Sequence, residues 1–258
     1  MSIKPPKMII ITGATGHLGR CYVAKAADKA AFILIDRDQH KLTELVSQLP
    51  NPSWHSAYAI DLANEDQRNT IIQKILEQNK VIDILVNAAA YTGDTIQNGW
   101  VAPFEEQSID AWRAALEVNL TACFDLCQKL YPQMKLADDG NILNIGSIYG
   151  ELGPDMRIYS GTDMGNPAAY AASKGAISQL TRWLAAVLAP EVRVNCISPG
   201  GILRNQPKRF IEAYEQKVPL KRMATEEDVV GAMLFLTLGA AQYITGHNLV
   251  IDGGFSIW

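Results

Sequence analysis

The stretch that decides the fold is residues 9–20, IIITGATGHLGR, where an apolar run leads into a glycine-rich turn and then into a helical pattern. Gly13, Gly16 and Gly19 have GxxGxxG spacing in this stretch. Glycine lets a backbone approach a pyrophosphate closely, and a helix N-terminus offers free N–H groups and a positive dipole. Three glycines also occur in purely structural turns, but the order strand, turn, helix favours dinucleotide binding.

The rest of the chain repeats this alternation of short apolar runs and helical patterns. Buried strands separated by helices form a parallel sheet with helices on both faces. Since no linker, repeat or low-complexity segment interrupts the pattern, the sequence predicts an α/β fold, a Rossmann-type doubly wound parallel sheet of about seven strands, in a single domain over residues 1–258. We expect strands at 8–12, 32–36, 55–60, 82–87, 141–146, 193–198 and 248–251, and helices at 17–29, 41–49, 65–79, 108–135, 168–188 and 226–238.

Composition limits the partners that the chain can have. Its 258 residues are 48% hydrophobic and 19% charged, which is ordinary for a soluble globular protein. The formal net charge of −4 gives no basic field for nucleic acid or an anionic membrane, and no apolar run approaches membrane-spanning length. The four cysteines lack zinc-type spacing, which predicts free thiols, no metal site and a reducing cytoplasm. Residues 1–7 are typical of a short tail rather than a signal peptide.

The choice of cofactor is predicted from the end of the second strand. Asp36 would accept hydrogen bonds from the adenosine ribose hydroxyls and repel a 2′-phosphate, which favours NAD over NADP. A plain turn aspartate is the alternative. The neighbouring Arg37 leaves three readings open, since it could receive a phosphate, stack on adenine or face solvent.

Further cofactor contacts are expected where the third and fourth strands end. Asp61 and Leu62 would lie beside the adenine, and the small residues after Asn87 would let a cofactor approach closely, although packing explains them nearly as well. His17, in the first turn of the helix, is either a phosphate contact or a solvated histidine. Together with the glycine-rich turn, the predicted cofactor set is Gly13, Thr15, Gly16, His17, Leu18, Gly19, Asp36, Arg37, Asp61, Leu62, Asn87, Ala88 and Ala89.

Residues 168–188 predict a helix that carries chemistry. Tyr170 and Lys174 stand four residues apart, so they share one helical face, and the small Ala171 and Ala172 leave room beside them. An ammonium beside a phenol favours the phenolate, which is a competent base. Ser147 follows the preceding strand at its carboxyl end, where ligands bind in open α/β sheets. These residues predict a site for proton transfer.

At this point the chain resembles the short-chain dehydrogenase/reductase family, through the segments TGATGHLG, NAAA, VNL, IGS, YAASK, VNCISPGGI and IDGG, which span nearly its whole length. The resemblance implies an oxidoreductase that interconverts an alcohol and a ketone with a nicotinamide cofactor. Tyr170 is then the general acid/base, and Lys174 tunes it and holds the nicotinamide ribose. Ser147 would hydrogen-bond the reacting oxygen, and Asn119 would hold a proton-relay water.

The same resemblance implies an assembly and a further part of the cofactor site. Long helices around Asn119 and Tyr170 usually pair across subunits in this family, so we expect a homotetramer or a homodimer. The matching motifs add cofactor contacts at Tyr170, Lys174, Pro199, Gly200 and Ile202.

The sequence departs from the usual pattern of this family in four places. The GxxGxxG spacing is nearer that of extended, sugar-nucleotide-modifying relatives than the GxxxGxG of the basic form. NAAA stands in place of NNAG, which removes one side-chain contact, and Lys221 stands where many relatives have glycine. Ser147 and Tyr170 are further apart than usual, which makes residues 151–167 an inserted loop.

The inserted loop and a later segment predict the substrate. Because both ends of the loop are catalytic, it must lie over the substrate pocket, and residues 202–221 are expected to close over it as a lid. The wording of the loop, with RNQP and PLKRMATEEDVVGAMLFL downstream, resembles short-chain oxidoreductases linked to flagellin or surface-polysaccharide sugar modification. The loop is rich in hydroxyl and amide groups, so we expect a small sugar or sugar-acid substrate, phosphorylated or nucleotide-linked forms included, contacted by Arg157, Tyr159, Asn166 and Arg204.

Two other functions remain open from the sequence. A 3-oxoacyl-[acyl-carrier-protein] reductase should favour NADPH and carry a basic docking patch, against which Asp36 and the acidic balance argue. A catalytically idle nucleotide-binding subunit would not need the complete set of Asn, Ser, Tyr and Lys.

Overall fold

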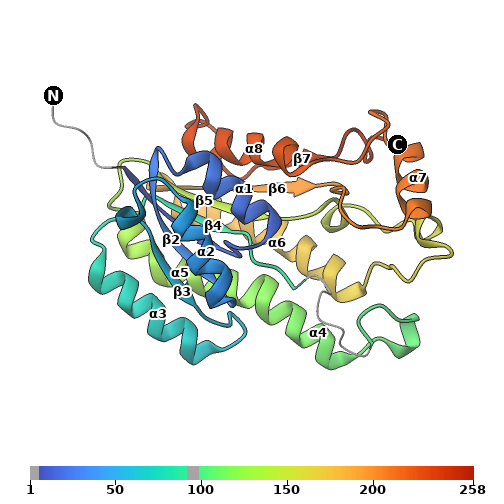
Figure 1. Cartoon of the computed structure of the whole chain (residues 1–258), viewed down its shortest axis with the longest axis horizontal. Coiled ribbons are helices and arrows are strands. Elements are labelled where there is room, and N and C mark those ends of the chain that lie inside the picture. The colour runs from blue at the N-terminus through green and yellow to red at the C-terminus, as the bar shows by residue number, and fades with distance from the viewer. Residues whose placement is uncertain (1–5, 92–98) are drawn as a thin grey trace.

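The structure, a computed structural model, describes residues 6–91 and 99–258, so most of the expected tail at 1–7 lies outside the described residues. Seven strands form one parallel sheet in the order β3-β2-β1-β4-β5-β6-β7 (Figure 1). The order runs outward from β1 in both directions, which confirms the predicted doubly wound α/β fold. The strands are β1 (Lys7–Thr12), β2 (Ala30–Asp36), β3 (Ser56–Ala59), β4 (Ile84–Asn87), β5 (Gly140–Ile145), β6 (Val192–Pro199) and β7 (Asn248–Ile251).

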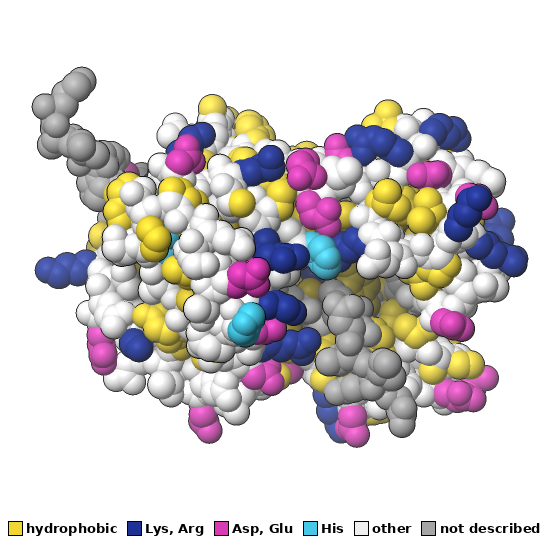
Figure 2. Space-filling view, in the orientation of Figure 1, with side chains coloured by type: hydrophobic (Ala, Val, Ile, Leu, Met, Phe, Trp, Pro, Cys, Tyr) yellow, Lys and Arg dark blue, Asp and Glu magenta, His cyan; other side chains and the backbone are white. Residues whose placement is uncertain are grey.

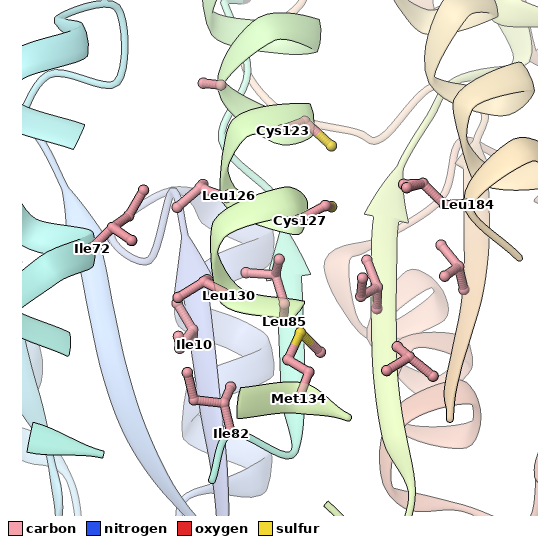
Figure 3. Packing of buried hydrophobic residues seen from close by; sticks show 14 of the residues in the cluster. Ile10, Ile72, Ile82, Leu85, Cys123, Leu126, Cys127, Leu130, Met134 and Leu184 are labelled. Atoms are coloured by element: carbon pink, nitrogen blue, oxygen red, sulfur yellow. The ribbon is translucent and has the colours of Figure 1, made fainter. Parts of the chain in front are cut away.

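Helices cover both faces of the sheet, as expected. One apolar cluster, the α1-face cluster, includes Tyr22 of α1, Leu42 of α2 and Val230 of α8. The α5-face cluster includes Ile72, Leu126 and Leu184 from α3, α5 and α6 (Figure 3). The helices are α1 (His17–Ala26), α2 (Gln39–Gln48), α3 (Glu65–Gln78), α4 (Ile109–Leu116), α5 (Ala122–Met134), α6 (Ala168–Leu188), α7 (Lys208–Lys217) and α8 (Glu226–Leu238).

The single helix expected at residues 108–135 is interrupted. Between α4 and α5 lies one π-helical turn, Glu117–Thr121, which carries Asn119. Such a turn adds one residue to the helix, and π turns often occur at functional sites. Asn119 is therefore presented by a local change of helix geometry within an otherwise continuous element.

A third apolar cluster joins the inserted loop to the expected lid. This loop–lid cluster contains Ile148, Ile158, Tyr159, Phe210, Tyr214, Val218, Met223 and Phe255. Aromatic rings connect it, with centroids 5.3 Å apart for Tyr159 and Phe210 and 4.8 Å apart for the stacked Tyr214 and Phe255. Helix α7 lies beyond the carboxyl end of β6 (Figure 1), so the loop and the lid segment form one packed layer at that edge of the sheet.

The surface carries charges of both signs. On the face shown in Figure 2, Lys and Arg side chains are interspersed with Asp and Glu. Within residues 6–91 and 99–258, no helix has the length and apolar character needed to cross a membrane. The same ranges hold no group of three or more His, Cys, Asp or Glu side chains placed to bind a metal ion, and all four cysteines are free.

Candidate active site

The glycine-rich turn between β1 and α1 packs backbone against backbone. Gly13 has φ +67°, and a Cβ atom there would lie 2.8 Å from the backbone of Ala89. At Gly19 a Cβ atom would lie 2.2 Å from the carbonyl oxygen of Gly13, so neither position admits a side chain. Gly16 precedes α1 and provides no side-chain cap, which leaves the first N–H groups of the helix for an anion. This cradle fits a dinucleotide pyrophosphate.

Asp36 is fixed at the edge of the same turn. Its Oδ2 accepts a hydrogen bond from the Thr15 N–H at 2.9 Å, and its Oδ1 accepts one from the Arg37 N–H at 2.8 Å. The Arg37 side chain is exposed, as is His17. The structure therefore brings Thr15 and Asp36 together, as the dinucleotide prediction requires, with Arg37 beside them.

The neighbouring positions form the rest of this edge. Leu62 is buried in the α5-face cluster, while Asp61 is exposed and its carboxylate accepts a hydrogen bond from the Ala63 N–H. Leu18 and Ala88 pack against the α1-face cluster. Leu62, Leu18 and Ala88, all predicted as cofactor contacts, therefore also contribute to the packing of the core.

Lys174 lies inside the protein beside Tyr170. Its residue is 3% exposed, its Nζ donates to the carbonyl oxygen of Ile145 at 2.7 Å, and that Nζ is 5.7 Å from the centroid of the Tyr170 ring. Ser147 follows β5, and its Oγ accepts a hydrogen bond from the Tyr149 N–H. The turn that contains Ser147 and Tyr149 packs closely against α6, because a Cβ atom at Gly150 would lie 2.7 Å from the backbone of Lys174. Ser147, Tyr170 and Lys174 thus belong to one packed unit.

Asn119 is held from two sides. Its Nδ2 donates to the Ser173 hydroxyl at 2.9 Å, and its Oδ1 accepts from the Tyr91 N–H at 2.6 Å. Because Ser173 immediately precedes Lys174, these bonds tie the π turn to the catalytic face of α6. The Asn119 side chain is therefore oriented at both its nitrogen and its oxygen.

A small cavity borders this group. Its lining includes Asn119, Lys174, Ala89, Thr12 and Asn87. The Asn87 Oδ1 is buried, and it has no hydrogen-bond partner among the described residues. Its lining is mixed, since Leu62 and Val118 also border it, and the Asn87 Oδ1 would offer a water there an acceptor. The relay water expected near Asn119 stays a prediction.

The segment after β6 is packed just as closely. The Gly200 N–H donates to the carbonyl oxygen of Ile251, and a Cβ atom at Gly200 would lie 2.8 Å from the Tyr214 hydroxyl of α7. Pro199 ends β6, and Ile202 forms an isolated bridge with Ala224. These three predicted cofactor residues therefore lie where the sheet meets the lid.

The predicted substrate residues divide into two groups. Tyr159 and Asn166 come together, since the Asn166 side chain is close enough to interact with the Tyr159 phenol. Arg157 is 86% exposed at its side chain and forms a bidentate ion pair with Asp155. Arg204 forms an ion pair with Glu226 at 3.1 Å. Each arginine thus has a carboxylate partner of its own.

Two residues near the site are not marked by any sequence motif. The Tyr149 hydroxyl accepts a hydrogen bond from the Tyr159 hydroxyl, and its place two residues after Ser147 was the available signal. Arg68 is buried on α3, where it pairs with Glu117 of the π turn and Asp125 of α5. No signal marked Arg68, since it stands in a polar stretch of an amphipathic helix.

A doubly wound sheet with a glycine turn after β1 and a Ser-Tyr-Lys group after β5 defines an oxidoreductase that uses a nicotinamide dinucleotide. Comparison with known proteins agrees, because residues 18–256 match the family model described as enoyl-(acyl carrier protein) reductase. The chain belongs to the short-chain dehydrogenase/reductase family, which confirms the resemblance.

Curated relatives cover almost the whole chain. Post-translational flagellin modification protein A of Campylobacter coli is 30% identical over 255 residues, which are 97% of this chain and 98% of that protein. The 3-oxoacyl-[acyl-carrier-protein] reductase of Thermotoga maritima is 29% identical over 260 residues, with 97% and 98% covered.

Solved structures show the same fold with either cofactor. A short-chain dehydrogenase from Leptospira borgpetersenii with bound NAD+ has a TM-score of 0.85 at 35% identity, covering 99% of this chain and 97% of that one. An NAD+-bound xylitol dehydrogenase has 0.83 at 28%, covering 97% and 99%. A gluconate 5-dehydrogenase from Burkholderia cenocepacia, in complex with NADP and tartrate, has 0.83 at 26%, covering 99% and 97%.

Proposed function

We propose that this protein transfers hydride between NAD(H) and a hydroxyl or ketone of a sugar-type small molecule. The observation that carries the reaction is the group of Ser147, Tyr170 and Lys174 on one packed unit beside the glycine-rich turn. When bound, the nicotinamide ring supplies the site that accepts or gives the hydride.

The residues of the chain then handle the proton. Tyr170 takes the hydroxyl proton of the substrate in the oxidative direction and returns it in reduction. Lys174 places its positive charge beside the Tyr170 ring, which stabilises the phenolate that forms. The Ser147 oxygen already accepts the Tyr149 N–H, so its own proton is available to the reacting oxygen. Asn119 keeps α6 in position through Ser173.

The preference for NAD rests on Asp36. Two backbone N–H groups fix its carboxylate at the turn, and each oxygen keeps a lone pair for a ribose hydroxyl. A 2′-phosphate would meet that negative charge. Arg37 offsets part of the repulsion, so we expect a preference for NAD rather than strict exclusion of NADP.

The substrate class rests on the inserted loop and on relatives. Support comes from the Tyr149 and Tyr159 hydroxyls, which are near enough to the catalytic tyrosine to interact with it, and from the Asn166 amide next to Tyr159. The names of relatives include a flagellin modification protein and dehydrogenases of xylitol and gluconate. The matching 3-oxoacyl-[acyl-carrier-protein] reductases keep thioester reduction as the alternative.

We also propose that the chain works in the cytoplasm as a homotetramer or homodimer. Support for self-association comes from large apolar side chains exposed on α4, α5 and α6, namely Ile109, Trp112, Phe124, Trp183 and Val187. Free thiols at all four cysteines agree with a reducing compartment.

The test is an assay of NADH formation with a panel of polyols and sugar acids, run beside the reduction of acetoacetyl thioesters with NADH and NADPH. We expect turnover of sugar-type substrates with NAD and little reduction of thioesters. Strong thioester reduction with no sugar turnover would transfer the assignment to the reductase alternative. Binding of NADH without turnover of any substrate would indicate the idle nucleotide-binding subunit.

A further inference from the structure

A row of polar side chains crosses the inserted loop and ends at Tyr149. The Asn166 side chain interacts with the Tyr159 phenol, and the Tyr159 hydroxyl donates a hydrogen bond to the Tyr149 hydroxyl at 2.8 Å. The Tyr149 proton is thereby left for another acceptor, and no such acceptor is found among the described residues. As a whole residue Tyr149 is half-buried, while Tyr159 is 7% exposed.

This row of side chains ends close to the reacting groups. Tyr149 lies two residues after Ser147 in the turn that packs on α6, and its phenol is near enough to Tyr170 for the two to interact electrostatically. Burial raises the pKa of the Tyr149 phenol, and it likewise raises the pKa of Tyr159. Both groups are therefore neutral hydrogen-bond donors near neutral pH.

Three cations of the loop and lid are already paired with carboxylates. Asp155 binds Arg157 from the loop and Lys217 from α7. Arg204 is paired with Glu226. An anionic group on the substrate would compete with these carboxylates for Arg157, Lys217 or Arg204.

A neighbouring feature also disfavours an anion. The Asn166 Oδ1 is buried with no hydrogen-bond partner among the described residues, which places a partial negative charge beside the Tyr159 phenol. Arg209 lies beside Gly161 of the loop, but it is exposed, and an ion pair in contact with solvent contributes little. Hydroxyl groups suit a neutral donor beside an acceptor better than a carboxylate or phosphate does.

We propose that Tyr149, which Tyr159 and Asn166 hold in position, binds a second oxygen of the substrate. The substrate is then an uncharged polyol or the matching ketose rather than a sugar acid or a sugar phosphate. The proposal rests on the proposed function and narrows its substrate class. Tyr149 would contact substrate directly, whereas Tyr159 and Asn166 would act through it.

The experiment compares one substitution on substrates with one and with several hydroxyls. Tyr149→Phe is assayed with NAD on xylitol or sorbitol, and on 2-butanol or cyclohexanol, which have a single hydroxyl. We expect kcat/KM for the polyol to fall about tenfold, mostly through KM, and kcat/KM for the single-hydroxyl alcohol to stay within about twofold. Tyr159→Phe should give the same pattern with a smaller loss.

The matched control is Tyr22→Phe, which removes another buried phenol hydroxyl, bonded to Thr237 between α1 and α8. It should leave the ratio of polyol to single-hydroxyl activity unchanged. Retained NADH binding, titrated by fluorescence, verifies that each variant is folded. If Tyr149→Phe does not fold, the same comparison of substrates with Tyr159→Phe tests the proposal.

Three outcomes would overturn the proposal while the proposed function stood. One is an equal loss on both kinds of alcohol, which indicates a structural role for Tyr149. Another is no loss on either. The third is gluconate or a sugar phosphate turned over at least tenfold more efficiently than the neutral polyols by the unaltered protein. Absence of activity on every sugar-type compound would instead reject the proposed function, and this inference with it.

Discussion

Replacing Arg68 with methionine should destabilise the fold strongly, because it leaves carboxylates without their buried partner. The Arg68 side chain is 3% exposed, and its guanidinium binds Glu117 at 2.8 Å, Asp125 at 3.1 Å and the carbonyl oxygen of Leu62. Breaking a buried ion pair from one side costs about 3–5 kcal/mol. Glu117 is a third exposed and Lys129 stays paired with Asp125, so we expect a loss nearer 2–3 kcal/mol here.

For a domain of this size, such a loss lowers the thermal midpoint by about 5–10 °C. Thermal unfolding monitored by circular dichroism measures it. Turnover well below the midpoint should fall too, because Glu117 begins the π turn that carries Asn119. Arg113→Met is the matched control, since that side chain is 74% exposed in its pair with Asp110 and should cost less than about 1 kcal/mol. Equal midpoints for the two variants would refute the reasoning.

Three further predictions concern chemistry, cofactor and pH. Tyr170→Phe should lower turnover about a hundredfold or more while NADH affinity, titrated by fluorescence, changes little; near-normal turnover would reject the mechanism. Asp36→Ala should relax the preference for NAD, and tighter binding of NADPH than NADH to the unaltered protein would show the preference to be wrong. The hydrogen bond from Arg222 lowers the pKa of Asp228 in the folded protein. The ionised Asp228 therefore contributes its full stabilisation above the ordinary carboxyl pKa, and this stabilisation is lost as the pH falls through the lowered pKa of the folded state. The stability difference between Asp228→Asn and the unaltered protein, measured by urea unfolding, should therefore narrow as the pH is lowered from about 5 to about 3; a difference independent of pH would contradict this.

Most of the fold follows from local pattern. The helices at 168–188 and 226–238 and the strand at 248–251 have the expected bounds, because periodicity and flanking turn residues agree there. The π turn at Glu117–Thr121 was missed, since one added residue barely changes the spacing of apolar residues across a long helix. Arg68 could not be identified either, because its burial depends on carboxylates far away in the sequence.

The candidate site was predictable in its glycines and its catalytic group but less so in its substrate end. Sequence spacing locates Tyr170 and Lys174 on one face, and the structure places them so. Arg157 and Arg204 were expected to contact a sugar or sugar-acid substrate, but composition does not reveal that Asp155 and Glu226 pair with them. Side-chain pairing across separate segments is a tertiary property.

The loop–lid cluster has a consequence for how specificity is inherited. Tyr159 from the inserted loop and Phe210 from α7 bury their rings against one another, so neither segment has a complete apolar core by itself. A chimera that received only one of the two segments from a relative would expose the apolar side chains of the other. To transfer the substrate range of this chain to a relative, both segments should therefore be exchanged together. For the same reason, we expect the two segments to change together as lineages diverge.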